Sequence, residues 1–95
     1  MADQAESLFL KKIIMKKCEL GKSGARRVSQ ILGSAKALHS LILTNNNFGP
    51  EGAQEIAKGL CSNTTLLLLD LGHNSIDEKA ARKLCDAFRN EGPPL

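Results

Sequence analysis

Apolar residues in this chain return at a fixed interval, so that three similar segments begin 28 positions apart, at 10, 38 and 66. The segments read LKKIIMKKCELGKSGA, LHSLILTNNNFGPEGA and LLLLDLGHNSIDEKAA. A period of about 20 to 50 residues is typical of architectures built from stacked repeats. We therefore divide the chain into repeat 1 (10–37), repeat 2 (38–65) and repeat 3 (66–91), with a leading segment at 1–9 and a tail at 92–95.

Two periodicities lie inside each repeat. Early in the repeat apolar residues alternate with a period of two, as in Leu41 and Leu43, which predicts a short strand. Later they recur every four residues, as in Gly52, Ile56 and Leu60, which places them on one stripe of a helix. Neither element buries its apolar side alone, so the repeats are expected to stack, with the strands in a parallel sheet and the helices behind it. The equivalent positions are Ile13, Met15, Gly24, Val28 and Leu32 in repeat 1, and Leu69, Leu71, Ala80, Leu84 and Phe88 in repeat 3.

Small residues and one polar column complete the repeat. Gly21 and Gly49 supply permissive backbone after the strand, and the small residues of the Gly24 column are expected to let each helix begin close to the sheet. The polar column holds Cys18, Asn46 and Asn74. An asparagine side chain carries two donor hydrogens and an acceptor, so it can satisfy backbone groups that a short strand leaves unpaired. We interpret this column as a structural ladder, in which the cysteine packs well but bonds less.

The pattern LxxLxLxx(N/C)xL, with a 28-residue period and a long helix, resembles leucine-rich repeats of the ribonuclease-inhibitor type from residue 10 to about residue 90. Similar repeats occur in ribonuclease inhibitor, in NOD-like receptors and in activators of the nuclear-transport GTPase. The phrases GAQEIAKGL and SNTTLLLLDLGHN are most similar to the receptor repeats. The resemblance implies an α/β solenoid, a horseshoe segment with its parallel sheet on the concave side and its helices on the convex side. It also implies protein binding, although such repeats define a fold more closely than a function.

Strand residues between the buried columns are expected to point toward the concave side and to face a protein partner. Lysines dominate this surface in repeat 1, and apolar residues there and in the other repeats could supply the centre that interfaces usually need. The predicted partner-binding residues are Lys12, Ile14, Lys16, Ser40, Ile42, Thr44, Leu68, Asp70 and His73, with Gly72 on the same face and Lys11, Lys17, His39, Asn45 and Leu67 at the rim.

Charge adds one alternative function. The formal net charge is +3, and Lys11, Lys12, Lys16 and Lys17 lie within seven residues. This basic patch could bind nucleic acid or another acidic surface weakly, but it contains no aromatic residue to stack on bases, so nucleic acid is a less favoured partner than protein. The lysines could equally form a solvated face that keeps the sheet edge from pairing.

The sequence offers no pattern typical of an enzyme, a cofactor or a metal site. His39 and His73 have no nucleophile and carboxylate at a suitable spacing for catalysis. Gly21-Lys22-Ser23 copies the end of a phosphate-binding loop, but Lys16 stands where that loop requires glycine. We therefore expect a non-enzymatic chain that binds neither cofactor nor metal.

Cysteine usage and hydropathy suggest a compartment. Cys18, Cys61 and Cys85 are an odd number and form no CxxC motif, so we expect buried free thiols in a reducing, cytoplasmic environment. No apolar stretch approaches the roughly 20 residues needed to span a bilayer, and the first residues lack the order of a secretory signal, so no membrane partner is expected. The acceptor pattern for glycosylation at Asn63 would matter only in a secreted protein.

The sequence predicts a cap over the first repeat and none over the last. Asp3 and Glu6 have the spacing of a capping box, so residues 1–9 could form a short helical cap or half repeat. Gly92 and the two prolines after it are expected to stop the third helix at about residue 90 or 91. Nothing after Phe88 is long enough to cover repeat 3. Either the chain is an excerpt of a longer repeat protein, or the open repeat is used for self-association.

Overall fold

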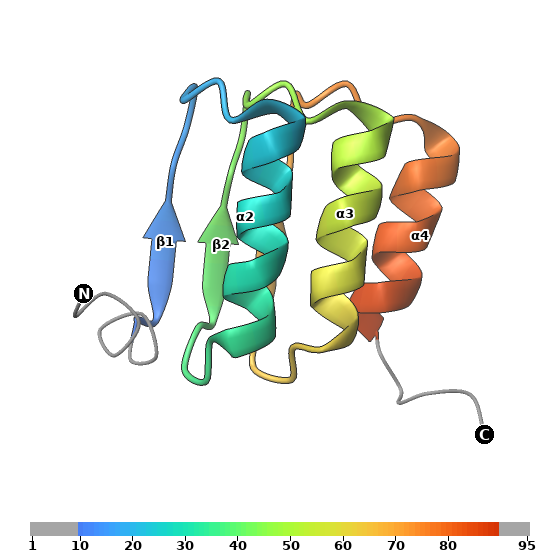
Figure 1. Cartoon of the computed structure of the whole chain (residues 1–95). Coiled ribbons are helices and arrows are strands. Elements are labelled where there is room, and N and C mark those ends of the chain that lie inside the picture. The colour runs from blue at the N-terminus through green and yellow to red at the C-terminus, as the bar shows by residue number, and fades with distance from the viewer. Residues whose placement is uncertain (1–9, 90–95) are drawn as a thin grey trace.

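The computed structural model describes residues 10–89, in which three strands alternate with three helices. Figure 1 shows two layers, with all the described helices on the same side of the sheet. The expected cap at 1–9, the helix end at 90 or 91 and the tail at 92–95 lie outside the described residues. The elements are β1 (Lys12–Ile14), α2 (Gly21–Ser34), β2 (Ser40–Ile42), α3 (Gly49–Cys61), β3 (Leu68–Asp70) and α4 (Glu78–Arg89).

The strands form one parallel sheet in the order β1-β2-β3, which confirms the predicted architecture. Lys12 pairs with Ser40, and Ser40 pairs with Leu68, so the partners across the sheet are 28 positions apart in the chain. The period of the sequence is therefore the register of the sheet. Each side chain lies beside its counterparts from the neighbouring repeats.

The core lies between the sheet and the helices and is most complete in repeat 2, which is packed between the other two. Leu38, Leu43 and Ile56 are fully buried there. The outer repeats differ from the sequence expectation, because their columns have a neighbour on one side only among residues 10–89. Met15 and Phe88 were expected to point inward, yet their exposed fractions are 38% and 40%.

Backbone geometry explains the turn that leads from each strand to its helix. Lys17, Glu19 and Gly21 all have positive φ, and the same alternation recurs 28 positions later at Asn45, Asn47 and Gly49. The left-handed conformation favours glycine, so the predicted role of Gly21 and Gly49 is confirmed.

The next small column has a different role from the one expected. A Cβ at Gly52 would approach the side chains of Phe48 and Ala25 rather than the sheet. This glycine therefore lets the helix begin close to the preceding turn and to the helix of the preceding repeat.

Packing between helices depends on a glycine that the sequence did not single out. A Cβ at Gly59 of α3 would lie 2.6 Å from the carbonyl oxygen of Ser29 in α2. Backbone therefore approaches backbone here, and no larger side chain fits without moving the helices apart. The counterpart of Gly59 in repeat 3 is Ala87, which is also small and is buried.

Candidate functional site

The predicted partner-binding residues of the strands alternate with Ile13, Leu41 and Leu69, which pack in or against the core, so they lie on the face of the sheet away from the helices. We call this face the open face, and Figure 1 shows the helices on the other side of the sheet. Strand register brings Lys12, Ser40 and Leu68 together in one row and Ile14, Ile42 and Asp70 in the next. Ile14 and Leu68 expose about half of their side-chain surface, with exposed fractions of 51% and 49%. The remaining predicted residues are exposed at Lys16 and His73 and partly exposed at Thr44.

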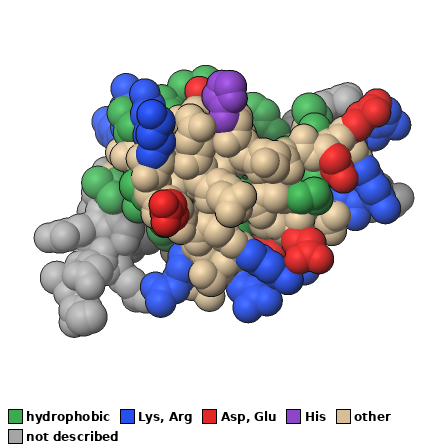
Figure 2. All heavy atoms as spheres, turned by 90° about the horizontal axis from the view of Figure 1, so that it is seen from above, with side chains coloured by type: hydrophobic (Ala, Val, Ile, Leu, Met, Phe, Trp, Pro, Cys, Tyr) green, Lys and Arg blue, Asp and Glu red, His purple; other side chains and the backbone are tan. Residues whose placement is uncertain are grey.

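Charge on this part of the molecule is mixed. Within residues 10–89, none of the four lysines beside β1 forms an ion pair. Across the sheet, the Asp70 carboxylate accepts a hydrogen bond from the Gly72 backbone N–H at 3.0 Å. Figure 2 views the end of the molecule where the strands finish, and its charged and hydrophobic side chains form small separate groups. Charged groups of both signs therefore lie on this part of the molecule.

The asparagine column links neighbouring repeats through hydrogen bonds. Asn46 Oδ1 accepts the Cys18 backbone N–H at 2.8 Å, and Asn46 Nδ2 donates to the Met15 carbonyl at 2.7 Å and to the Leu43 carbonyl at 3.0 Å. Asn74 repeats the pattern one unit later, since its Oδ1 accepts the Asn46 backbone N–H at 2.6 Å and its Nδ2 donates to the Leu43 carbonyl at 2.9 Å. Each asparagine therefore fastens its own turn to the turn before it.

The expectation of buried cysteines was wrong, because all three thiols are exposed. Cys18 lies in the turn of repeat 1, which no earlier repeat covers among the described residues, and its thiol donates a 3.4 Å bond to the Lys16 carbonyl. Cys61 ends α3 at the surface. Cys85 faces the uncovered side of repeat 3.

Asn63 has a structural role that the sequence did not reveal. Its side chain is 7% exposed, and Nδ2 donates to the Leu32 carbonyl at 3.0 Å. Its Oδ1 accepts the backbone N–H groups of Thr65 and Leu66. Glycosylation would modify this nitrogen, which in the folded chain is already hydrogen-bonded within the connection between repeats 2 and 3. The only sequence signal was a polar residue just after a helix end.

An apolar groove of about 340 Å³ lies on the side of repeat 3 that no described residue covers. Leu67 and Leu68, which precede the lining residue Leu69 in the chain, are exposed, as the run of leucines predicted, with an exposed fraction of 74% at Leu67. The sequence indicated that repeat 3 lacked cover but did not define this groove. It is lined by Leu69, Leu71, Ile76, Ala81, Leu84, Cys85 and Phe88.

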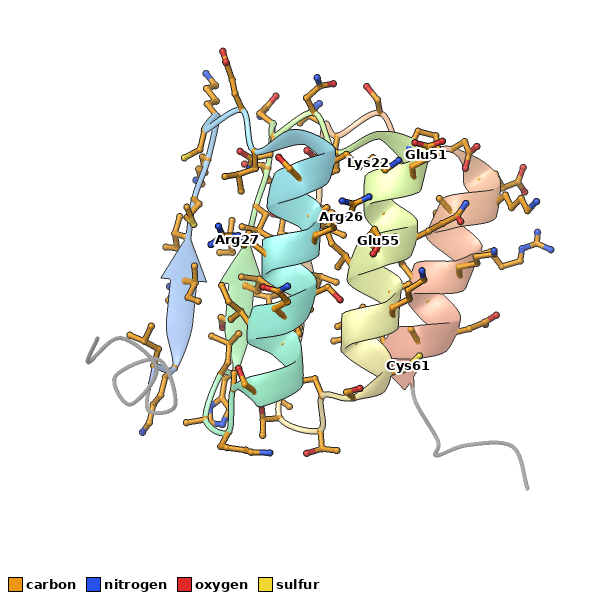
Figure 3. The ribbon with its side chains drawn as sticks, viewed as in Figure 1. Lys22, Arg26, Arg27, Glu51, Glu55 and Cys61 are labelled. Carbon is orange, nitrogen blue, oxygen red and sulfur yellow. The ribbon has the colours of Figure 1, made fainter. Side chains whose placement is uncertain are left out.

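The helix side of the slab carries polar contacts between repeats. Lys22 in α2 forms an ion pair with Glu51 in α3, with 2.9 Å between Nζ and Oε1 (Figure 3). This hydrogen bond and the positive charge of Lys22 lower the pKa of the Glu51 carboxyl. Both side chains are solvent-exposed, so the pair lies at the contact between α2 and α3 but contributes little to its stability.

Lys22→Ala is expected to return the pKa of Glu51 upward toward its ordinary value, which an NMR titration of the Glu51 carboxyl would measure. A carboxyl with a lowered folded pKa favours the fold at higher pH, and this contribution is lost as the pH falls through that pKa. Stability at neutral pH should change little because the pair is exposed. Lys79→Ala is the control, and an unchanged Glu51 titration in Lys22→Ala would contradict the assignment.

The described residues contain neither a metal-binding cluster nor a membrane-spanning helix. Within residues 10–89, no group of three or more His, Cys, Asp and Glu side chains is placed to hold a metal ion. None of the helices in this range combines the length and the apolar character needed to cross a membrane.

Known proteins share the sequence pattern. The profile of the family described as "Leucine Rich repeat" matches residues 36–57 and 62–85. The chain is 33% identical to NACHT, LRR and PYD domains-containing protein 14 of Homo sapiens over 75% of its length, and 32% identical to protein 13 of the same series over 79%. It is 38% identical over 56% of its length to a Caenorhabditis elegans protein phosphatase 1 regulatory subunit 37 homolog. The chain spans only 7%, 7% and 6% of these relatives.

Proposed function

Because this chain is a leucine-rich-repeat protein whose repeats resemble those of NOD-like receptors, we propose that it binds a protein partner through the open face of its sheet. Leucine-rich-repeat domains generally mediate protein–protein interaction. One relative is named a regulatory subunit of a phosphatase, which is consistent with a non-catalytic interaction module. The observation that carries the proposal is the exposure of Ile14 and Leu68 between charged side chains on one surface.

The open face has the composition of a binding surface rather than of a solvated sheet. Ile14, Ile42 and Leu68 place apolar surface on the three successive strands, and burial of such groups supplies most of the free energy in protein interfaces. Lys12 and Lys16 lie at one end of this surface and Asp70 at the other, so they can set the orientation of a partner of mixed charge. We expect the partner to present apolar side chains beside an acidic group that meets the lysines.

Photo-crosslinking tests the position of the site. We would place p-benzoylphenylalanine at Thr44, on the open face, and in a second protein at Lys58, which is exposed on α3, and irradiate both in cell extract. The expected result is a discrete crosslinked product from Thr44 and none from Lys58.

Substitution then tests the residues. In the Thr44 protein, changing Lys12, Lys16 and Asp70 together to serine is expected to reduce that product about tenfold, because the orienting charges are lost. The circular dichroism spectrum should stay that of the parent, since these side chains lie outside the core. Unchanged crosslinking by the triple variant, or equal crosslinking from Lys58, would contradict the proposal and move the site to the helices or the ends.

A further inference from the structure

The groove on repeat 3 repeats a surface that is already covered elsewhere in the molecule. In repeat 2, the seven counterparts of its lining residues all belong to the core, and none is more than 8% exposed because repeat 3 lies against them. The groove is therefore the face that a following repeat would cover. The counterparts, 28 positions earlier and in the order of the groove residues given above, are Leu41, Leu43, Phe48, Ala53, Ile56, Ala57 and Leu60.

The adjoining sheet edge restricts what can fill this groove. In repeat 2, the Leu43 N–H donates to the Asp70 carbonyl at 2.8 Å and the Asn45 N–H to the Gly72 carbonyl at 3.0 Å. The same donors in repeat 3 belong to Leu71 and His73, beside β3, which is an edge strand within residues 10–89. A small molecule or a lone helix could fill the groove but would leave this edge unpaired. A matching occupant brings a strand and a helix together.

We propose that the groove and the β3 edge bind a leucine-rich-repeat unit of a partner protein, which adds a strand beside β3 and a helix beside α4. This surface is separate from the open face, so the inference does not depend on the function proposed above. It rests on continuity with the interface between repeats 2 and 3, whose hydrogen bonds and burial describe the expected contact.

Three contacts between existing repeats specify the chemistry of that unit. It carries asparagine in the ladder column. Asn74 Oδ1 accepts the Asn46 backbone N–H, and in the same way the asparagine of the added unit accepts the Asn74 backbone N–H. It has glycine or alanine in the Gly59 column, where backbone approaches Ser29. It has a basic residue in the Glu51 column. Lys22 of repeat 1 pairs with Glu51 of repeat 2, and in repeat 3 the position of Lys22 is occupied by Glu78, so the matching partner of Glu78 is basic. Repeat 3 itself meets these conditions with Asn74, Lys79 and Ala87.

A second copy of this chain does not match. It would present its repeat 1, which has Cys18 in the ladder column, and a thiol lacks the carbonyl oxygen that Asn46 and Asn74 supply. It would also bring the much larger Ile31 to the column that holds Gly59 in repeat 2 and Ala87 in repeat 3, where neighbouring helices approach closely. In the Glu51 column, where the added unit has a basic residue, repeat 1 has Ser23. These differences favour another leucine-rich protein over self-association.

The experiment supplies the unit within one polypeptide. A copy of residues 62–89 is inserted between residues 89 and 90, with Cys85→Ala in the copy so that the original thiol can be followed by mass spectrometry. Alkylation of the original Cys85 by iodoacetamide is measured relative to the exposed Cys18, together with hydrogen exchange at the Leu71 amide. A matched control carries Asn74→Cys and Ala87→Ile in the copy, which reproduces the side chains of repeat 1 in these columns.

The expected result is at least about a tenfold slower alkylation of the original Cys85 and slower exchange at Leu71, because both groups then react only when the added unit opens. The control should leave both rates near those of the parent. No protection by the first copy would overturn the proposal, and equal protection by the control would overturn the stated chemistry. Self-association of the parent chain in light scattering, with protection of Cys85, would overturn the choice of partner in favour of a second copy.

Discussion

Asn46→Ala is expected to lower the free energy of unfolding by about 3 kcal/mol, because each buried hydrogen-bonding group left unsatisfied costs about 1 to 3 kcal/mol. The side chain is fully buried and joins repeats 1 and 2, accepting from Cys18 and donating to Met15 and Leu43. Alanine removes all of these bonds and leaves no room for an ordinary hydration shell. Urea denaturation followed by circular dichroism would measure the change.

Cys18→Ala is the matched control for this prediction, since it changes the same column in repeat 1. Cys18 is exposed, and its thiol makes one 3.4 Å bond to the Lys16 carbonyl. The expected loss is below about 1 kcal/mol, because solvent can replace a weak surface bond. Equal losses in the two variants would show that the ladder does not fasten the repeats.

Leu41→Ala is expected to cost about 2 to 5 kcal/mol, because it removes buried methyl groups and leaves a cavity. Leu41 lies on the central strand, is 2% exposed and has repeats packed on both sides. A domain of this size has little stability to spare, so the variant should be largely unfolded well below the melting temperature of the parent. Thermal denaturation would show the difference.

Two leucines provide a graded control. Leu69→Ala changes the same column beside the groove, where the side chain is partly exposed, and should cost less than Leu41→Ala. Leu67→Ala changes a largely exposed side chain and should cost under about 0.5 kcal/mol. A loss at Leu69 as large as the loss at Leu41 would contradict the conclusion that no residue among 10–89 covers the groove side of repeat 3.

The fold could be predicted because the residues that pack inside each repeat recur at the same positions in all three repeats. The period of 28 became the register between Lys12, Ser40 and Leu68, and the left-handed turns occur at Gly21 and Gly49 as expected. The sequence could not show which members of a column are buried, because burial depends on neighbours. Leu43 and Met15 share a column, yet only Leu43 has a repeat on each side among the described residues.

The cysteines illustrate the same limit. A small apolar thiol is usually buried, and the column of Cys85 is occupied in repeat 2 by the buried Ala57. Cys85 is exposed nevertheless, since no described element covers α4 as α4 covers α3. Composition and periodicity describe a repeat within an extended array, and the position of the repeat in this slab determines which of its faces meets solvent.

The sequence by itself determined the repeat, the parallel sheet and the open face, because strand alternation fixes the direction of each side chain once the period is known. Only the tertiary structure decided how the repeats are joined. The bonds of Asn46 and Asn63, the close approach of Gly59 to Ser29 and the groove beside β3 all depend on distances between units. Periodicity specifies which residues become neighbours, but three-dimensional packing sets how closely they approach and where the packing ends.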